Sequence, residues 1–327
     1  MTHLPFFHST IWVLAGRCSI MGAGCGLWIL EKEGIMKKMV LGTSTLEVSR
    51  IALGCMRLSE DRAQAMATLH AALDQGINFF DHADIYGRGQ REATFSHIWQ
   101  EAPRLRQEIL LQSKCGIRFA GDPDERSPAR YDFSAEHILR SVEGSLARLK
   151  TDYLDVLLLH RPDALVEPEE VARAFDELHR SGKVRWFGVS NHTWGQIQLL
   201  QTCVDQPLVA NQIELNPFNR LSQMPLVEAT RRHDITVVGY RPFANGAKFD
   251  HPVAAEIASR HGKTVAQVYL RWHVDHGTAA VPGWAPRRLM EENLDVFDFA
   301  LSDAELAALD ALDEDLKSAA IPPEAEF

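Results

Sequence analysis

Cysteine is scarce in this sequence, and the cysteines present form no recognisable redox or metal-binding motif. The 327 residues include five cysteines, an odd number without CxxC spacing. This pattern indicates reduced thiols in a cytoplasmic protein rather than a disulfide framework. Metal-ligand spacings such as HExxH are also missing, so we expect no metal site. We interpret His82, which stands beside Asp81, as a structural residue.

Positive charge is in deficit. Lysine and arginine together number 34, against 44 aspartates and glutamates, and the formal net charge is −10. Nucleic-acid-binding proteins need clustered positive charge, so we expect no nucleic-acid partner. The deficit does not exclude a phosphate-bearing cofactor, because such a cofactor needs only a local basic pocket.

A long uninterrupted apolar run is missing as well. Residues 11–30 are mostly apolar, but Arg17 interrupts them, and residues 1–10 contain no lysine or arginine to form the basic region of a signal peptide. The codons for residues 32–34 can contain a ribosome-binding sequence just upstream of Met36. We therefore interpret residues 1–35 as a non-native N-terminal extension, with a disordered or membrane-associated tail as the alternative. Residues 36–327 are expected to form a single domain without a membrane partner.

The fold is indicated by a regular alternation of strands and helices. Residues 39–42 and 46–48 flank a turn of Gly, Ser and Thr and predict a β-hairpin. After it, eight short apolar strands alternate with amphipathic helices, which implies parallel strands with right-handed crossovers. The predicted strands are 51–55, 77–81, 109–113, 154–159, 184–189, 207–213, 235–239 and 278–281.

Two α/β architectures fit this alternation. An open doubly wound sheet would carry a glycine-rich fingerprint after its first strand, and residues 54–57 do not form one. We therefore predict a (β/α)8 TIM barrel with an N-terminal β-hairpin and extra C-terminal helices. The last helix is expected to begin at Ser302, which forms a capping box with Glu305.

Polar residues follow the predicted strands at the end where barrel enzymes carry their active sites. Asp81 ends the second strand and needs a partner, because an unpaired buried charge costs several kcal/mol. Lys114 at the end of the third strand is the expected partner. Tyr86 lies in the loop after Asp81, and His160 ends the fourth strand. Later strand ends supply Ser190, Asn191, Gln212 and Tyr240.

These side chains suit the protonation of a carbonyl oxygen. A phenol has an ordinary pKa of about 10, and a neighbouring ammonium group lowers such a pKa by favouring the phenolate. In this interpretation Asp81 holds Lys114, Lys114 activates Tyr86 as the acid, and His160 orients the carbonyl. A hydride from a cofactor would add to the carbon at the same time. Lys114 alone would also fit a Schiff-base aldolase, but that function leaves Tyr86 unexplained.

Five stretches carry a resemblance to the aldo-keto reductase family, in particular to a bacterial branch of general oxidoreductases. They are residues 80–87 (FDHADIYG), 113–116 (SKCG), 158–163 (LLHRPD), 188–191 (GVSN) and 211–214 (NQIE), and the similarity extends from residue 38 to about 312. The resemblance implies a catalytic tetrad of Asp81, Tyr86, Lys114 and His160. It further implies that Ser190, Asn191 and Gln212 bind a nicotinamide carboxamide and that Tyr240 stacks on the nicotinamide ring.

The chain departs from the family pattern where the cofactor phosphates are expected. Many members have serine after the stacking aromatic residue, whereas this chain has Arg241, which could reach the pyrophosphate. Arg287 and Arg288 supply positive charge after the last strand, at shifted positions, and Glu292 and Asn293 follow them. A guanidinium group suits phosphate well. The expected cofactor is therefore NADP(H), with NAD(H) left open.

The expected function is reduction of an aldehyde or ketone, or oxidation of the corresponding alcohol, by an NADP(H)-dependent enzyme. The alternative is a cofactor-sensing binding subunit that turns over little substrate. The loop 117–132 is long and charged, and we interpret it as a solvated connector or as a lid over the substrate. The substrate and the oligomeric state cannot be read from the sequence.

Overall fold

A computed structural model describes residues 36–220, 224–246, 248–283 and 287–313, which belong to one compact unit. The expectation that residues 1–35 are an extension concerns residues outside this description and stays a prediction. No helix in the described part of the chain combines the length and apolar character needed to cross a bilayer.

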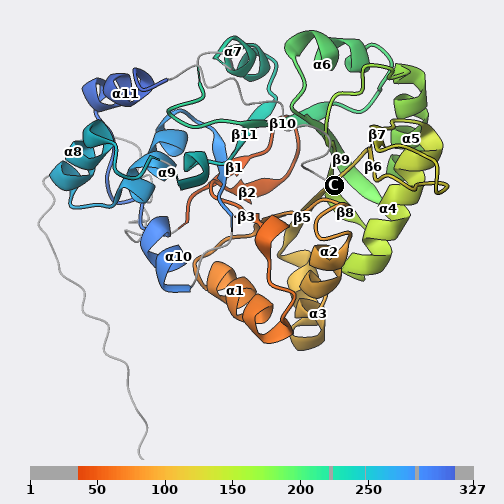
Figure 1. Cartoon of the computed structure of the whole chain (residues 1–327), viewed down its shortest axis with the longest axis horizontal. Coiled ribbons are helices and arrows are strands. Elements are labelled where there is room, and N and C mark those ends of the chain that lie inside the picture. The colour runs from red at the N-terminus through yellow and green to blue at the C-terminus, as the bar shows by residue number, and fades with distance from the viewer. Residues whose placement is uncertain (1–35, 221–223, 247, 284–286, 314–327) are drawn as a thin grey trace, which may run out of the picture. The chain divides into compact units, whose positions relative to one another are not determined.

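The centre of the structure is a parallel eight-stranded barrel (Figure 1). Its strands, in spatial order, are β3 (Leu53–Gly54), β4 (Phe79–Asp81), β5 (Leu110–Cys115), β8 (Leu154–Leu159), β9 (Val184–Ser190), β10 (Leu208–Glu214), β11 (Thr236–Tyr240) and β12 (Ala279–Val281). The Ala52 N–H donates to the Ala280 carbonyl (2.8 Å), and the Ala280 N–H donates to the Arg50 carbonyl (2.9 Å). These bonds join the first strand to the last, and the predicted (β/α)8 barrel is confirmed.

Helices surround the barrel and cover its outer face (Figure 1). They are α1 (Arg62–Asp74), α2 (Gln90–Phe95), α3 (Ile98–Glu101), α4 (Ala135–Leu149), α5 (Pro168–Arg180), α6 (Trp194–Gln201), α7 (Met224–Arg232), α8 (Pro252–His261), α9 (Val265–Asp275), α10 (Arg287–Leu294) and α11 (Asp303–Asp310). Short 3-10 turns add η1 (Cys55–Arg57), η2 (Pro103–Gln107) and η3 (Ala244–Gly246). The Ser302–Glu305 capping box at the start of α11 is present as expected.

One predicted helix is divided in the structure. The sequence pattern favours a helix near residues 90–102, but α2 ends at Phe95 and α3 begins at Ile98. The Ser96 hydroxyl donates to the Ala93 carbonyl (2.7 Å). Serine side chains that bond the nearby backbone compete with helical hydrogen bonds, which is a physical reason for the interruption.

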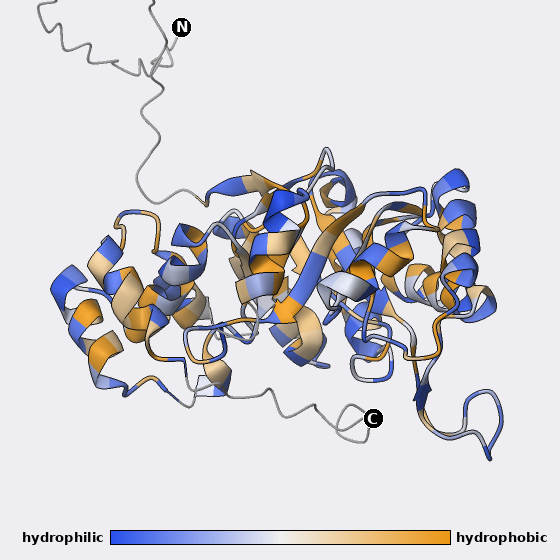
Figure 2. Cartoon of the chain, turned by 90° about the horizontal axis from the view of Figure 1, so that it is seen from above, coloured by the Kyte–Doolittle hydropathy of each residue, from blue (hydrophilic) through white to orange (hydrophobic). Residues whose placement is uncertain are grey.

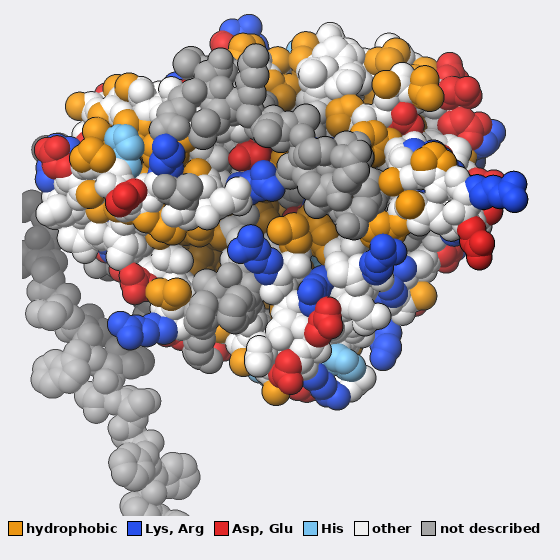
Figure 3. All heavy atoms as spheres, in the orientation of Figure 1, with side chains coloured by type: hydrophobic (Ala, Val, Ile, Leu, Met, Phe, Trp, Pro, Cys, Tyr) orange, Lys and Arg blue, Asp and Glu red, His pale blue; other side chains and the backbone are white. Residues whose placement is uncertain are grey.

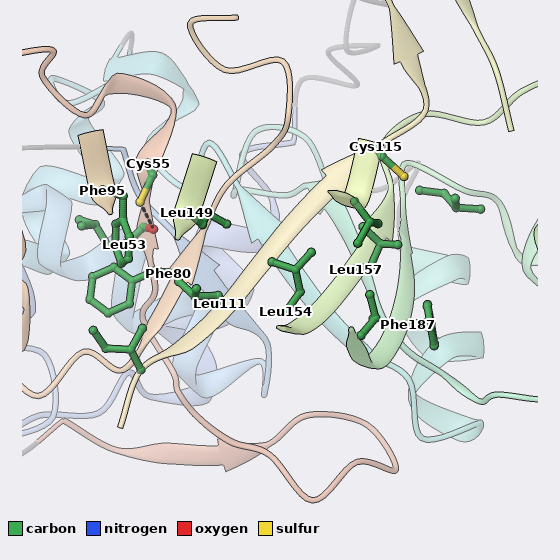
Figure 4. Close-up of a cluster of buried hydrophobic side chains, with 14 of the residues drawn as sticks. Leu53, Cys55, Phe80, Phe95, Leu111, Cys115, Leu149, Leu154, Leu157 and Phe187 are labelled. Atoms are coloured by element: carbon green, nitrogen blue, oxygen red, sulfur yellow. Dashed lines mark hydrogen bonds between the residues drawn. The ribbon is translucent and has the colours of Figure 1, made fainter. Parts of the chain in front are cut away.

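The core between strands and helices is apolar. Figure 4 shows side chains of this layer, among them Leu53, Phe80 and Leu111 from the barrel and Phe95 and Leu149 from the helices. All five are nearly inaccessible to solvent. Strand residues that alternate with them point into the barrel.

The N-terminal hairpin of β1 (Lys38–Val40) and β2 (Glu47–Ser49) closes one end of the barrel. Leu41 and Val48 pack with Phe79 and Val209, which lie near the starts of their strands. Gly42 makes this approach feasible, since its φ is +55° and a Cβ there would lie 2.3 Å from the Val209 carbonyl oxygen. The expected N-terminal hairpin is confirmed.

The loop 117–132 contains a second hairpin, formed by β6 (Ile117–Arg118) and β7 (Arg130–Tyr131). Arg118 Nε lies 2.6 Å from Asp132 Oδ2 and fixes the base of this hairpin. In Figure 2 the connection between the two strands projects from the barrel, at the lower right, on the side opposite the N-terminal hairpin. The loop therefore contains a β-hairpin, and whether it is a solvated connector or a lid over the substrate stays a prediction.

Candidate active site

The barrel brings the predicted site residues to one end of its strands. Strand β4 ends at Asp81, β9 ends at Ser190 and β11 ends at Tyr240. Lys114 lies one residue before the end of β5, and His160 directly follows β8. Because all eight strands are parallel, these positions share one face.

Lys114 is at the centre of the site. It is 1% exposed, and its ammonium group donates to Asp81 Oδ2 (2.9 Å), to the His82 carbonyl (2.9 Å) and to the Tyr86 hydroxyl (3.1 Å). Asp81 Oδ1 lies 2.8 Å from the same nitrogen. The expected Asp81–Lys114 pair is therefore present, and Tyr86 is in contact with it.

The electrostatics of Lys114 favour its charged form. Burial by itself would lower the pKa of Lys114, but the charges of Asp81 and Tyr86 and the hydrogen bonds to both outweigh burial and raise the pKa above its ordinary value. A charged ammonium therefore faces the Tyr86 hydroxyl through the neutral pH range. Its nitrogen also lies 4.9 Å from the centre of the Tyr86 ring.

His160 lies edge-on to Tyr86, with the ring centres 5.9 Å apart. It is 7% exposed, and its Nδ1 has no hydrogen-bond partner among the described residues. Burial, followed by the charges of Lys114 and Arg161, lowers the pKa of His160 well below its ordinary value. A neutral imidazole has one N–H donor, which suits it for holding a carbonyl oxygen beside Tyr86.

Gln112 is a member of this cluster that the sequence reasoning missed. Its Nε2 donates to Asp81 Oδ1 (2.6 Å), and the side chain is fully buried. It lies two residues before Lys114 on β5, so both side chains point into the barrel. A polar residue two positions before Lys114, on the same face of the strand, was the available signal.

Ser190, Asn191 and Gln212 lie together beyond His160. The Ser190 hydroxyl donates to the Gln212 carbonyl (2.9 Å), and Asn191 Nδ2 donates to Ser190 Oγ (2.9 Å) and to the His160 carbonyl (3.3 Å). Asn191 has a φ of +61°, a conformation that asparagine tolerates better than most residues. Its side chain is thereby turned toward His160.

Gln212 provides a test of whether these residues fit a nicotinamide carboxamide. Its side chain is 2% exposed, and Nε2 is a buried donor without a partner among the described residues. Such a donor costs free energy unless a ligand or water accepts from it. A carboxamide oxygen is a suitable acceptor. Asn191, whose amide is already bonded, would exchange one bond to join it.

Tyr240 and Arg241 follow Gln212 around the barrel. The Tyr240 hydroxyl donates to Asn191 Oδ1 (2.9 Å), which holds the ring beside the amide cluster. Arg241 Nη1 donates to Glu214 Oε2 (3.1 Å), so its charge is partly compensated. Its guanidinium lies 5.8 Å from the Tyr240 ring centre.

The other predicted phosphate-binding residues lie on α10. Arg288 is exposed, and the side chain of Arg287 is outside the described atoms. The Glu292 carbonyl accepts from Gln267 Nε2 (2.8 Å), which ties α10 to α9. On the face that carries β6 and β7, lysine and arginine side chains surround a small apolar area near the centre (Figure 3). Contacts of Arg287, Arg288, Glu292 and Asn293 with a cofactor stay a prediction.

Among the residues that the structure describes, no group of three or more His, Cys, Asp or Glu side chains is placed to hold a metal ion. His82 is fully buried and packs edge-on against Phe95 (4.7 Å between ring centres), away from any carboxylate ligand set.

Comparison with known proteins gives consistent matches. Residues 38–314 match the model of the Aldo/keto reductase family. A 6-dehydroglucose reductase from Novosphingobium aromaticivorans is 42% identical over 265 residues, which is 74% of this chain and 83% of that protein. A glyoxal reductase from Bacillus subtilis is 31% identical over 283 residues, covering 86% and 95%. The structure of the aldo-keto reductase AKR11C1 from Bacillus halodurans, in its holo form, superposes with a TM-score of 0.73 at 27% identity, covering 86% and 97%.

Proposed function

The chain belongs to the aldo/keto reductase family, and from this premise we propose that it reduces aldehydes with NADP(H), using Tyr86 as the proton donor. The observation that carries the proposal is the contact between the Lys114 ammonium and the Tyr86 hydroxyl (3.1 Å), with Lys114 itself held by Asp81. A buried cation at this distance stabilises the phenolate that remains when the proton leaves.

Each residue of the site has its own role in the proposed carbonyl reduction. The bound cofactor would supply a hydride to the carbonyl carbon. Tyr86 donates its proton to the carbonyl oxygen, and the Lys114 ammonium compensates the negative charge left on the phenol oxygen. Asp81 and Gln112 keep Lys114 in place. Neutral His160 donates an N–H to the same carbonyl oxygen and orients it under the hydroxyl.

Tyr86→Phe tests the assignment of the acid. The phenylalanine keeps the ring but removes the proton, so we expect kcat for aldehyde reduction to fall by about 10² to 10⁴-fold. NADPH binding, followed by its fluorescence, should change little, because the phenol is not among the carboxamide-binding groups. Retention of kcat in Tyr86→Phe would refute the mechanism. Tight NADPH binding without turnover of any aldehyde by the wild type would favour the cofactor-sensing alternative.

The cofactor preference rests on positive charge near the expected adenosine phosphate. Replacing Arg287 and Arg288 together with alanine should weaken NADPH binding much more than NADH binding, because only NADPH carries a 2′-phosphate. The dissociation constants of both cofactors measure this difference. An equal loss of affinity for NADPH and NADH would show that the two arginines do not recognise the 2′-phosphate.

The relatives suggest a substrate class for the proposed reductase. Glyoxal and 6-dehydroglucose both carry an aldehyde whose neighbouring carbon bears oxygen, and relatives are named for the reduction of each. We therefore expect higher kcat/KM for glyoxal and for oxidised sugars than for propanal, an aldehyde without that oxygen. A higher kcat/KM for propanal would show that oxygen on the neighbouring carbon does not determine the specificity.

A further inference from the structure

The side chain of Gln112 places a polar amide inside the barrel. Along the sheet it lies between Asp81 of β4 and Val156 of β8, and all three side chains are buried. A buried amide costs free energy for each polar end that is left without a hydrogen bond. Gln112 Nε2 donates to Asp81 Oδ1 (2.6 Å), whereas Gln112 Oε1 has no hydrogen-bond partner among the described residues. The bond to Asp81 is therefore the polar contact through which this amide can act on the site.

The orientation of the amide follows from the charge of its partner. An ionised carboxylate only accepts hydrogen bonds, so the NH2 group of Gln112 faces Asp81. The Lys114 ammonium nitrogen lies 2.8 Å from the same carboxylate oxygen, Asp81 Oδ1. The amide and the ammonium therefore share the negative charge of one carboxylate, and each weakens the attraction of that carboxylate for the other.

Lys114 transmits this effect to the phenol. An ammonium group has three N–H donors, and those of Lys114 reach Asp81 Oδ2 (2.9 Å), the His82 carbonyl (2.9 Å) and the Tyr86 hydroxyl (3.1 Å). Without the Gln112 amide, the full charge of Asp81 would draw the ammonium toward the carboxylate. The phenolate form of Tyr86 would then be stabilised less, and Tyr86 would be a weaker acid.

We propose that Gln112 is a positioning residue that sets the acidity of Tyr86: it takes up part of the charge of Asp81 and so leaves the Lys114 ammonium available to the phenol. Gln112 acts through Asp81 and Lys114 rather than on the substrate. The proposal rests on the proposed function in one respect, because it takes Tyr86 to be the group that protonates the carbonyl oxygen.

Other titratable and charged groups surround this phenol. They are Asp81, His82, Asp84 and Arg88 from β4 and its loop, Lys114 from β5, Cys55 from η1, Tyr131 from β7, and His160 and Arg161 after β8. Burial, followed by the charge of Lys114, lowers the pKa of His82 to about 3 and the pKa of His160 well below its ordinary value. Burial, followed by the charge of Asp81, raises the pKa of Cys55. These three groups therefore stay neutral while the phenol ionises.

The remaining groups are the same in every variant that is compared. Burial, followed by the charge of Glu92, raises the pKa of Asp84 to about 8, so Asp84 also titrates at alkaline pH. Asp84 and Tyr131 are unchanged when Gln112 is replaced. The difference in pH dependence between the variant and the wild type therefore reports the phenol of Tyr86.

The kinetic test replaces Gln112 with methionine, which keeps the approximate length of the side chain and removes the amide. We expect kcat for aldehyde reduction at neutral pH to fall about three- to tenfold, and its alkaline decline to move about half a unit to one unit to higher pH. Gln112→Asn, whose amide is one methylene shorter, should move the decline in the same direction. A purely structural role would lower the fraction of active enzyme at every pH and leave the midpoint of the decline in place.

Gln201→Met is the matched control, because the Gln201 amide bonds backbone groups before the start of β10, away from the catalytic ends of the strands. Its Nε2 donates to the Val204 and Gln206 carbonyls (2.9 and 3.0 Å), and its Oε1 accepts from the Leu208 N–H (3.0 Å). Both methionine variants should unfold at lower urea concentration than the wild type. The midpoint of the alkaline decline should move only in Gln112→Met.

A second measurement does not depend on turnover. The ultraviolet absorbance of phenolate, taken as the difference between each protein and its Tyr86→Phe counterpart, follows the ionisation of Tyr86 alone. This ionisation should occur at higher pH in Gln112→Met than in the wild type, and Gln112→Asn replaces the methionine variant if the latter does not fold. A midpoint equal to that of the wild type, or an equal displacement in Gln201→Met, would overturn the proposal. A displaced midpoint in a protein that reduces no carbonyl compound would refute the proposed function and leave the role of Gln112 standing.

Discussion

From the buried ion pair of Asp81 and Lys114 we predict how the loss of one partner changes both the stability and the activity of the protein. The two side chains are 4% and 1% exposed, and the nitrogen lies within 2.9 Å of both carboxylate oxygens. Replacing Lys114 with methionine keeps the approximate length of the side chain and removes its charge. Asp81 then stays buried with the Gln112 amide as its remaining side-chain donor.

The expected cost follows from that uncompensated charge. Breaking a buried ion pair by removal of one partner costs about 3 to 5 kcal/mol. In the Asp81→Asn, Lys114→Met double variant the charge is gone, so we expect a free energy of unfolding about 2 kcal/mol higher than in Lys114→Met alone. Both variants should be inactive in carbonyl reduction, because both lack Lys114. The double variant is therefore expected to regain stability without regaining activity.

Urea unfolding at neutral pH measures the three free energies, provided that the slope with denaturant stays constant. Lys183→Met is a suitable control, because Lys183 pairs with Glu143 at the surface and such pairs contribute about 0 to 1 kcal/mol. If Lys114→Met is as stable as the wild type, or the double variant is no more stable than Lys114→Met, then the carboxylate is compensated by other groups and the reasoning fails.

Two further perturbations test the scaffold. Burial lowers the pKa of His82 and of His273 to about 3, so the contribution of their neutral forms to stability is fully present above pH 6.5 and is lost as the pH falls toward 3. Each histidine should lower the free energy of unfolding by about 2 kcal/mol when the pH reaches about 5. Urea unfolding of His82→Leu should therefore depend less on acid pH than urea unfolding of the wild type. Gly42→Ala should lower the free energy of unfolding by more than about 1 kcal/mol, because φ is +55° and the Cβ would approach the Val209 carbonyl to 2.3 Å; an unchanged thermal midpoint would show that the hairpin shifts without cost.

The sequence allowed the barrel and the tetrad to be predicted for the same reason. Parallel strands place their carboxyl ends on one face, so a polar residue after a buried strand already has an approximate position. Asp81, Lys114 and His160 follow this rule, and the structure places them within one cluster with Tyr86. Local periodicity was sufficient for these features, because each depends on a strand and its end.

Features that depend on a distant partner were beyond this reasoning. The hydrogen bond of Arg241 to Glu214 was not foreseen, because it depends on the register of β10 and β11; that Arg241 reaches the cofactor pyrophosphate stays a prediction. The β6–β7 hairpin has two residues in each strand, too few to show an alternating pattern. The bond of Glu92 to Arg148 joins residues 56 positions apart on two helices.

The alternation of side chains along β5 couples the proposed catalytic site to the layer of side chains behind it. Gln112 and Lys114 point into the barrel and bind Asp81, whereas Ser113 between them points outward and binds Glu92. A shift of this strand by a fraction of an ångström would therefore alter the contacts of Lys114 and those of Glu92 together. Contacts on both faces of one strand therefore bear on the distance from the Lys114 ammonium to the Tyr86 hydroxyl.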